Sequence, residues 1–120
     1  MQEYHLCDSE YRFMQVVWES APVGSGRLVE LCEARLGWKK STTYTVLKKL
    51  CERGLLKHEN STVTVLAERE AVTAEAAEIF VEKTFGGSLP GFLTAFMSGR
   101  TLSEEEAAEL KRLIDAHREG

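Results

Sequence analysis

Apolar residues recur every three or four positions along most of the chain, which predicts a mainly α-helical protein. Three such stretches lie in the first half, at residues 8–20, 25–36 and about 40–53. Asp8 is the expected cap of the first stretch, the Ala21-Pro22 step ends it, and glycines follow the other two. These stretches predict three short helices around one apolar core.

The pattern then changes from helical spacing to β-prone segments. Residues 55–59 and 62–66 are rich in strand-forming side chains, and Asn60 and Ser61 lie between them as a two-residue turn. Glycine would suit the second turn position better than serine does. Three helices followed by a two-stranded ribbon predict a winged helix-turn-helix domain over residues 1–67.

Helical spacing returns in residues 68–120, the expected second domain. Three helices fit, at residues 73–85, 88–97 and from Ser103 onward, where a capping box begins. The large apolar side chains expected on their faces are Ile79, Phe80, Phe85, Phe92, Leu93, Phe96, Leu110, Leu113 and Ile114. About 50 residues are too few to bury these faces alone, so we expect a homodimer interface. A pocket for a hydrophobic effector is the alternative.

Charge is distributed unevenly along the chain. The 120 residues have a formal net charge of −4, which by itself argues against a nucleic-acid partner. Residues 27–58, however, contain eight basic and three acidic side chains, a net charge of +5. Because the local field decides where a polyanion binds, this segment is the expected binding region.

The outward side of the third predicted helix is suited to DNA. It offers hydroxyl and ammonium groups, with no carboxylate before Glu52. Short hydroxyl side chains let the helix approach base edges, and lysines neutralise phosphates. The candidate DNA contacts are Lys39, Lys40, Ser41, Thr42, Tyr44, Thr45, Lys48 and Lys49. A solvated helix face and a protein-interaction module are the alternatives, and Tyr44 suits either a DNA sugar or packing on the wing.

Other classes of function have little support in the sequence. No nucleophile-base pair, phosphate-binding loop or HExxH motif occurs, so we do not expect an enzyme. Cys7, Cys32 and Cys51 are far apart and complete no metal pattern with the histidines, so neither metal nor cofactor is expected. No apolar run approaches the ~20 residues of a membrane span, and the first residues do not resemble a signal peptide. We therefore expect a cytoplasmic protein.

The order of these features resembles the penicillinase-repressor family of winged-helix transcriptional regulators (the BlaI, MecI and CopY type). The similarity spans residues 6–117. It rests on L-x-x-S-E-Y-x-x-M-x-x-x-W at 6–18, Pro22, Gly37-Trp38, Ser41-Thr42, T-x-L-x-K-L-x-x-R-G at 45–54, Phe85-Gly86-Gly87 and Leu102-Ser103. The resemblance implies a dimeric repressor that binds a palindromic operator. It also implies recognition contacts by Ser41, Thr42, Thr45 and Lys49.

The resemblance further implies a mode of regulation. In antibiotic-responsive members a membrane sensor-protease pathway leads to cleavage before a phenylalanine in the C-terminal arm, which corresponds to residues 68–120 here. The similar position in this chain is Ala95-Phe96. Three differences from the family stand out. Lys39 occupies the usual capping position of the third helix, so the cap is expected at Ser41 or the first turn frays. The wing tip is short and uncharged, and no cysteine follows Cys51, which excludes the copper-sensing cysteine cluster.

Overall fold

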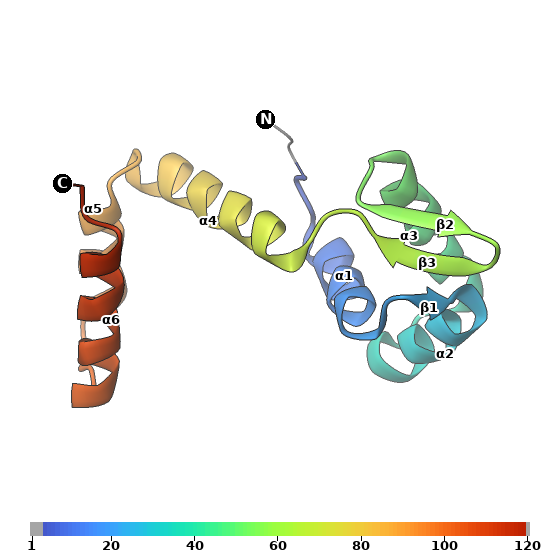
Figure 1. Cartoon of the computed structure of the whole chain (residues 1–120), viewed down its shortest axis with the longest axis horizontal. Coiled ribbons are helices and arrows are strands. Elements are labelled where there is room, and N and C mark those ends of the chain that lie inside the picture. The colour runs from blue at the N-terminus through green and yellow to red at the C-terminus, as the bar shows by residue number, and fades with distance from the viewer. Residues whose placement is uncertain (1–3, 120) are drawn as a thin grey trace. The chain divides into compact units, whose positions relative to one another are not determined.

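The computed structural model describes residues 4–119 and confirms a mainly helical winged-helix fold (Figure 1). Its elements are α1 Asp8–Ser20, β1 Val23–Gly24, α2 Ser25–Leu36, α3 Lys40–Glu52, β2 Leu56–Glu59, β3 Thr62–Val65, α4 Arg69–Phe85, α5 Leu89–Met97 and α6 Glu104–Ala116. One compact unit ends at Ile79 and a second begins at Phe80. The outermost residues of the predicted domains, 1–3 and 120, lie outside the described residues.

The first unit is built around a single apolar core. Helices α1, α2 and α3, the sheet and the first turn of α4 all contribute buried side chains. Phe13 of α1 is fully buried and stacks on Trp38, with ring centroids 5.6 Å apart. Val72 is also buried in this core. Its packing accounts for the start of α4 at Arg69, four residues before the predicted start.

The cap of α1 differs from the predicted one. Cys7 is the N-cap and Asp8 is the first helical residue, so the assignment of Asp8 as the cap was wrong. The Cys7 thiol accepts from the backbone N–H of Glu10, and the Glu10 carboxylate accepts from the backbone N–H of Cys7 at 3.0 Å. This reciprocal pair is a capping box in which cysteine replaces the usual serine or threonine.

The wing is a three-stranded antiparallel sheet in the order β1-β3-β2. The two predicted strands are present, and Asn60 and Ser61 join them with φ values of 51° and 58°, the positive angles that a type I′ turn requires. Strand β1, which pairs Val23 with Val63, was not predicted. Two residues are too few to produce an alternating pattern.

The second unit has no buried side chain in α5 or α6. Ser88 caps α5 by accepting from the N–H of Gly91 at 2.9 Å, and Ser103 caps α6 by accepting from the N–H of Glu106 at 3.1 Å, as predicted. Within residues 4–119, no helix has the combination of length and apolarity needed to cross a bilayer. Because α5 and α6 have no buried side chain, their apolar residues are only partly covered by the described chain.

Candidate nucleic-acid interface

Helix α3 is anchored by one face and exposes the other. Thr43, Leu47 and Leu50 are buried in the core. The helix begins at Lys40 with Lys39 as its N-cap, and no side chain caps it, so a cap at Ser41 was wrong. The backbone N–H groups of the first turn are left without a side-chain acceptor, and such groups favour an anionic ligand.

The opposite side of α3 presents short hydroxyls beside lysines. We define the α3 outer face as six exposed residues: Lys39, Lys40, Ser41, Thr42, Thr45 and Lys48. The Thr45 hydroxyl donates to the backbone carbonyl of Ser41 at 2.9 Å. This bond fixes the hydroxyl rotamer and leaves its lone pairs free to accept from a base amino group.

The lysines of this face differ from the other basic groups of residues 27–58. The remaining five each pair with a carboxylate: Arg27 with Glu30, Arg35 with Glu19, Lys57 with Glu59, and both Lys49 and Arg53 with Glu10. Lys39, Lys40 and Lys48 form no ion pair with any described residue. The unneutralised positive charge of the segment is thus concentrated on the α3 outer face.

Lys49, a predicted DNA contact, is already engaged within the protein. Its ammonium nitrogen lies 3.0 Å from Oε2 of Glu10, although 61% of the lysine side chain is exposed. Arg53, one turn further on, places Nη1 3.3 Å from Oε1 of the same carboxylate. Glu10 could not be predicted as this partner, because periodicity gives no signal for a polar residue that packs between two helices.

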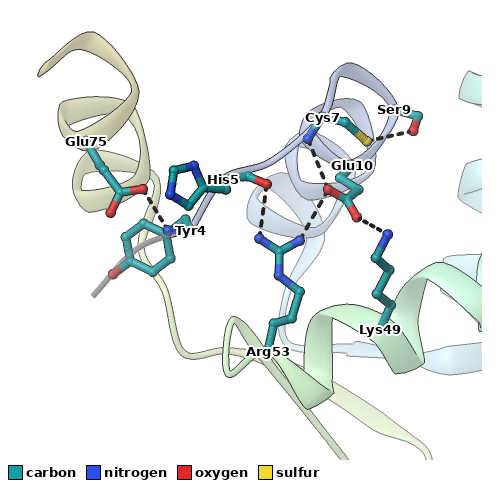
Figure 2. Close-up of polar contacts among 8 residues, drawn as sticks. All are labelled: Tyr4, His5, Cys7, Ser9, Glu10, Lys49, Arg53 and Glu75. Carbon is teal, nitrogen blue, oxygen red and sulfur yellow. Dashed lines mark hydrogen bonds and ion pairs between the residues drawn. The ribbon is translucent and has the colours of Figure 1, made fainter. Parts of the chain in front are cut away.

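Glu10 is the most deeply buried charged group in the described chain, with only 6% of its side chain exposed. Burial raises the pKa of its carboxyl, but the N–H of Cys7 and the ammonium of Lys49 outweigh burial and lower the pKa to about 2. Figure 2 shows the carboxylate between the N-terminus of α1 and the two cations from the end of α3. Glu10 is therefore ionised at neutral pH.

The segment before α1 extends this polar network. Arg53 donates from Nη2 to the backbone carbonyl of His5 at 3.1 Å, and the backbone N–H of Tyr4 donates to Glu75 of α4 at 2.7 Å (Figure 2). The end of α3, the N-terminal segment and the beginning of α4 are thus linked within the first unit.

Two aromatic residues of the first unit, Tyr44 and Trp18, make contacts within the protein. The Tyr44 ring lies 6.5 Å from the His58 ring of β2, which favours packing on the wing over the DNA-sugar alternative. The Trp18 indole N–H donates to the carbonyl of Ala67 at 3.0 Å, and Arg69 lies over its ring. The wing tip itself carries no charge, as the sequence indicated.

The cysteines form no site in the described residues. All three are free thiols, and burial raises the pKa values of Cys32 and Cys51. Within residues 4–119, no cluster of three or more histidine, cysteine, aspartate or glutamate side chains is arranged to hold a metal ion.

The candidate interface residues of the arm are distributed over partly and fully exposed positions. Phe80, Phe96, Leu113 and Ile114 are exposed, and Ile79, Phe85, Phe92, Leu93 and Leu110 are half-buried. Phe92 lies 5.6 to 6.0 Å, between ring centroids, from Phe80, Phe85 and Phe96. The proposed cleavage pair, Ala95 and Phe96, is exposed and lies within α5.

Comparison with known proteins agrees with this architecture. A family model described as penicillinase repressor matches residues 6–116. An uncharacterized 16.5 kDa protein in the ptsI 3' region of Latilactobacillus sakei is 32% identical over 117 residues, covering 92% of this chain and 79% of that protein. The penicillinase repressor of Bacillus licheniformis is 21% identical over 117 residues, covering 94% of this chain and 91% of the relative.

A further relative is similar over nearly the same length of this chain. The methicillin resistance regulatory protein MecI of Staphylococcus epidermidis is 20% identical over 116 residues, covering 93% of this chain and 94% of that protein. The matched region includes the winged helix and most of the arm. The chain therefore belongs to the penicillinase repressor family.

Proposed function

We propose that the protein is a dimeric transcriptional repressor that inserts α3 into the major groove of a palindromic operator. The observation that carries the proposal is the α3 outer face, where three unpaired lysines flank short hydroxyl side chains. Membership of a family whose relatives include a named repressor supports the same function. Such a regulator needs no catalytic group, and its place of action is the cytoplasm, where the DNA is.

Residues of the α3 outer face have two roles in this proposal. Ser41, Thr42 and Thr45 contact base edges, because their side chains are short enough for close approach. Lys39, Lys40 and Lys48 contact phosphates and supply most of the affinity. Lys49 is left out of this set because its ammonium group already pairs with Glu10.

Dimerisation through the second unit completes the proposal. The exposed apolar side chains of α5 and α6 gain burial when a second copy covers them. Two linked α3 helices then bind half-sites about one DNA turn apart, roughly 34 Å. Linkage raises affinity because the second half-site binds at a high effective concentration.

Inactivation by cleavage of the arm is a separate hypothesis, taken from the family resemblance. A sensor-protease pathway that cuts between Ala95 and Phe96 would remove α6 and lower operator affinity without altering α3. The test is to replace Ala95 with glycine and Phe96 with serine, and then to compare the chain lengths of the variant and the wild-type protein in cells exposed to an inducer. Intact wild-type chain under induction would reject this hypothesis and leave the repressor proposal in place.

Salt dependence of binding tests the function directly. Fluorescence anisotropy with a labelled duplex from upstream of its own gene should show tight binding that falls about 10³–10⁵-fold between 50 and 200 mM salt, given six to ten phosphate contacts. A scrambled duplex is the control for specificity. Binding that barely responds to salt would instead support the protein-interaction alternative, and a hydrophobic ligand that releases DNA would support an effector-binding regulator.

A further inference from the structure

We propose that Glu10 is a positioning residue that keeps Lys49 away from DNA and fixes the C-terminal half of α3 against α1. The inference rests on the proposed function, because it divides the basic residues of α3 into DNA contacts and structural cations. In this proposal Lys48 contacts a phosphate, whereas the neighbouring Lys49 does not.

The first step is the geometry of the carboxylate. Lys49 and Arg53 are four residues apart, so they lie on the same side of α3, which faces the N-terminus of α1. Oε1 of Glu10 accepts from the N–H of Cys7 at 3.0 Å and from Nη1 of Arg53 at 3.3 Å. Oε2 lies 3.0 Å from the ammonium nitrogen of Lys49. One buried carboxylate thus joins two consecutive turns of α3 to the capping box of α1 (Figure 2).

The second step is the cost of releasing Lys49. Oε2 of Glu10 is buried and has no hydrogen-bond partner of good geometry among the described residues. The ammonium of Lys49 is the nearest positive charge to that oxygen in the described chain. Moving this ammonium to a phosphate would leave the buried oxygen without its charge partner, which is unfavourable in a poorly solvated site.

The third step is the contrast with Lys48. This lysine is adjacent in sequence, is exposed, and forms no ion pair with a described residue. A phosphate therefore attracts Lys48 without breaking an existing contact. Lys48 and Lys49 are adjacent and both exposed, and they differ in that Lys49 pairs with Glu10.

The test measures how the affinity for the labelled upstream duplex depends on salt. Each phosphate contact contributes about 0.9 to the magnitude of the slope of log affinity against log salt. Because the proposed dimer presents Lys48 twice, Lys48→Ala should lower this magnitude by about two, whereas Lys49→Ala should leave it at the wild-type value. A purely structural effect of either change would lower affinity without altering the slope.

Substitution of Glu10 supplies the converse result. Glu10→Gln keeps the shape of the side chain and removes its charge, so Lys49 becomes free to contact a phosphate. With one Lys49 released in each chain of the proposed dimer, the slope should steepen by about two, and the double variant Glu10→Gln with Lys49→Ala should return to the wild-type slope. Circular dichroism establishes that each variant is folded. If Glu10→Gln does not fold, the comparison of Lys48→Ala with Lys49→Ala decides the question, because both positions are exposed.

Equal reductions of the slope in Lys48→Ala and Lys49→Ala would overturn the inference, as would a folded Glu10→Gln variant with the wild-type slope. The Lys48→Ala variant separates this result from failure of the proposed function. If the wild-type protein shows no salt-dependent binding and Lys48→Ala changes nothing, α3 does not contact DNA and both proposals fall.

Discussion

The buried carboxylate of Glu10 determines which contacts are made by several residues that are distant from it in sequence. It completes the cap of α1, pairs with Lys49 and Arg53 of α3, and remains ionised because these contacts outweigh its burial. By its position in the sequence, Glu10 is simply an acid in the first turn of a helix, where it complements the helix dipole. Two cations four residues apart were visible in the sequence, but the position of their partner depends on how α1 crosses α3.

The pKa of Glu10 makes stability depend on pH. Because the folded-state pKa is lowered from 4.5 to about 2, the folded protein holds this proton less tightly than the unfolded chain does. The carboxylate therefore stabilises the fold above pH 4.5, and this contribution is lost as the pH falls toward 2. We expect the contribution to be about 3 kcal/mol in the free energy of unfolding.

Urea unfolding of the wild-type protein and Glu10→Gln at several pH values between 7 and 3 measures this contribution. The wild-type free energy of unfolding should fall more steeply in acid than that of the variant, which lacks the titrating group. Identical pH profiles would show that Glu10 is not stabilised as an anion. The exposed carboxylates contribute to both profiles and cancel in the comparison.

At the level of elements, the sequence predicted most boundaries. The bounds of α1 and α2 agree with the predicted ranges, and α3 differs only at its last residue, because capping residues, proline and glycine interrupt each helical pattern. The pattern of apolar residues did not predict the segments whose structure depends on tertiary packing. Strand β1 exists only through its pairing with β3, and the first turn of α4 forms where Val72 joins the core.

The wing turn offers a test of local conformation. Ser61 has a φ of 58°, in the left-handed region that side chains with a Cβ rarely adopt. Ser61→Gly should therefore raise the free energy of unfolding by about 1 kcal/mol. Asn60→Gly is the matched control, and its effect should be smaller because asparagine tolerates this region. Thermal or urea unfolding compares the two, and a destabilised Ser61→Gly variant would contradict the assigned turn.

Removal of the Thr45 hydroxyl tests whether α3 recognises the base sequence. Thr45→Val preserves the shape of the side chain and removes the hydroxyl that bonds to the Ser41 carbonyl. We expect a changed preference among half-site sequences, by about tenfold at one base pair, because a base contact is lost. Binding to a panel of duplexes with single base changes measures the preference.

Thr73→Val is a suitable control for this experiment. Thr73 makes the same type of hydroxyl-to-carbonyl bond, with Arg69, but belongs to α4 and is not part of the α3 outer face. Its substitution should leave the half-site preference unchanged. An unchanged preference in Thr45→Val as well would exclude Thr45 from base recognition.

At the level of the whole molecule, the two units have different sources of stability. The first unit has a continuous buried core, whereas α5 and α6 have no buried side chain. The sequence indicated this difference, because the short arm contains more large apolar residues than it can bury by itself. It did not indicate that the first compact unit extends through Ile79, because helical periodicity in α4 continues without a break.

The proposed dimer is tested by a charge on the exposed apolar surface of α6. Ile114 is 56% exposed, so Ile114→Asp removes little packing within the chain. In a dimer, the same change buries a carboxylate in an apolar interface, and we expect a monomer. Light scattering measures the mass. Arg112→Asp, on the opposite side of α6, is the control and should remain dimeric; an unchanged mass in Ile114→Asp would exclude this surface from the interface.

The uncovered helices α5 and α6 also have a consequence for cell physiology. If operator binding requires paired chains, the amount of active regulator varies with the square of copy number whenever most chains are single. Dilution by growth would then release transcription sooner than a one-chain regulator would. A promoter controlled in this way responds to protein abundance as a threshold, without any ligand.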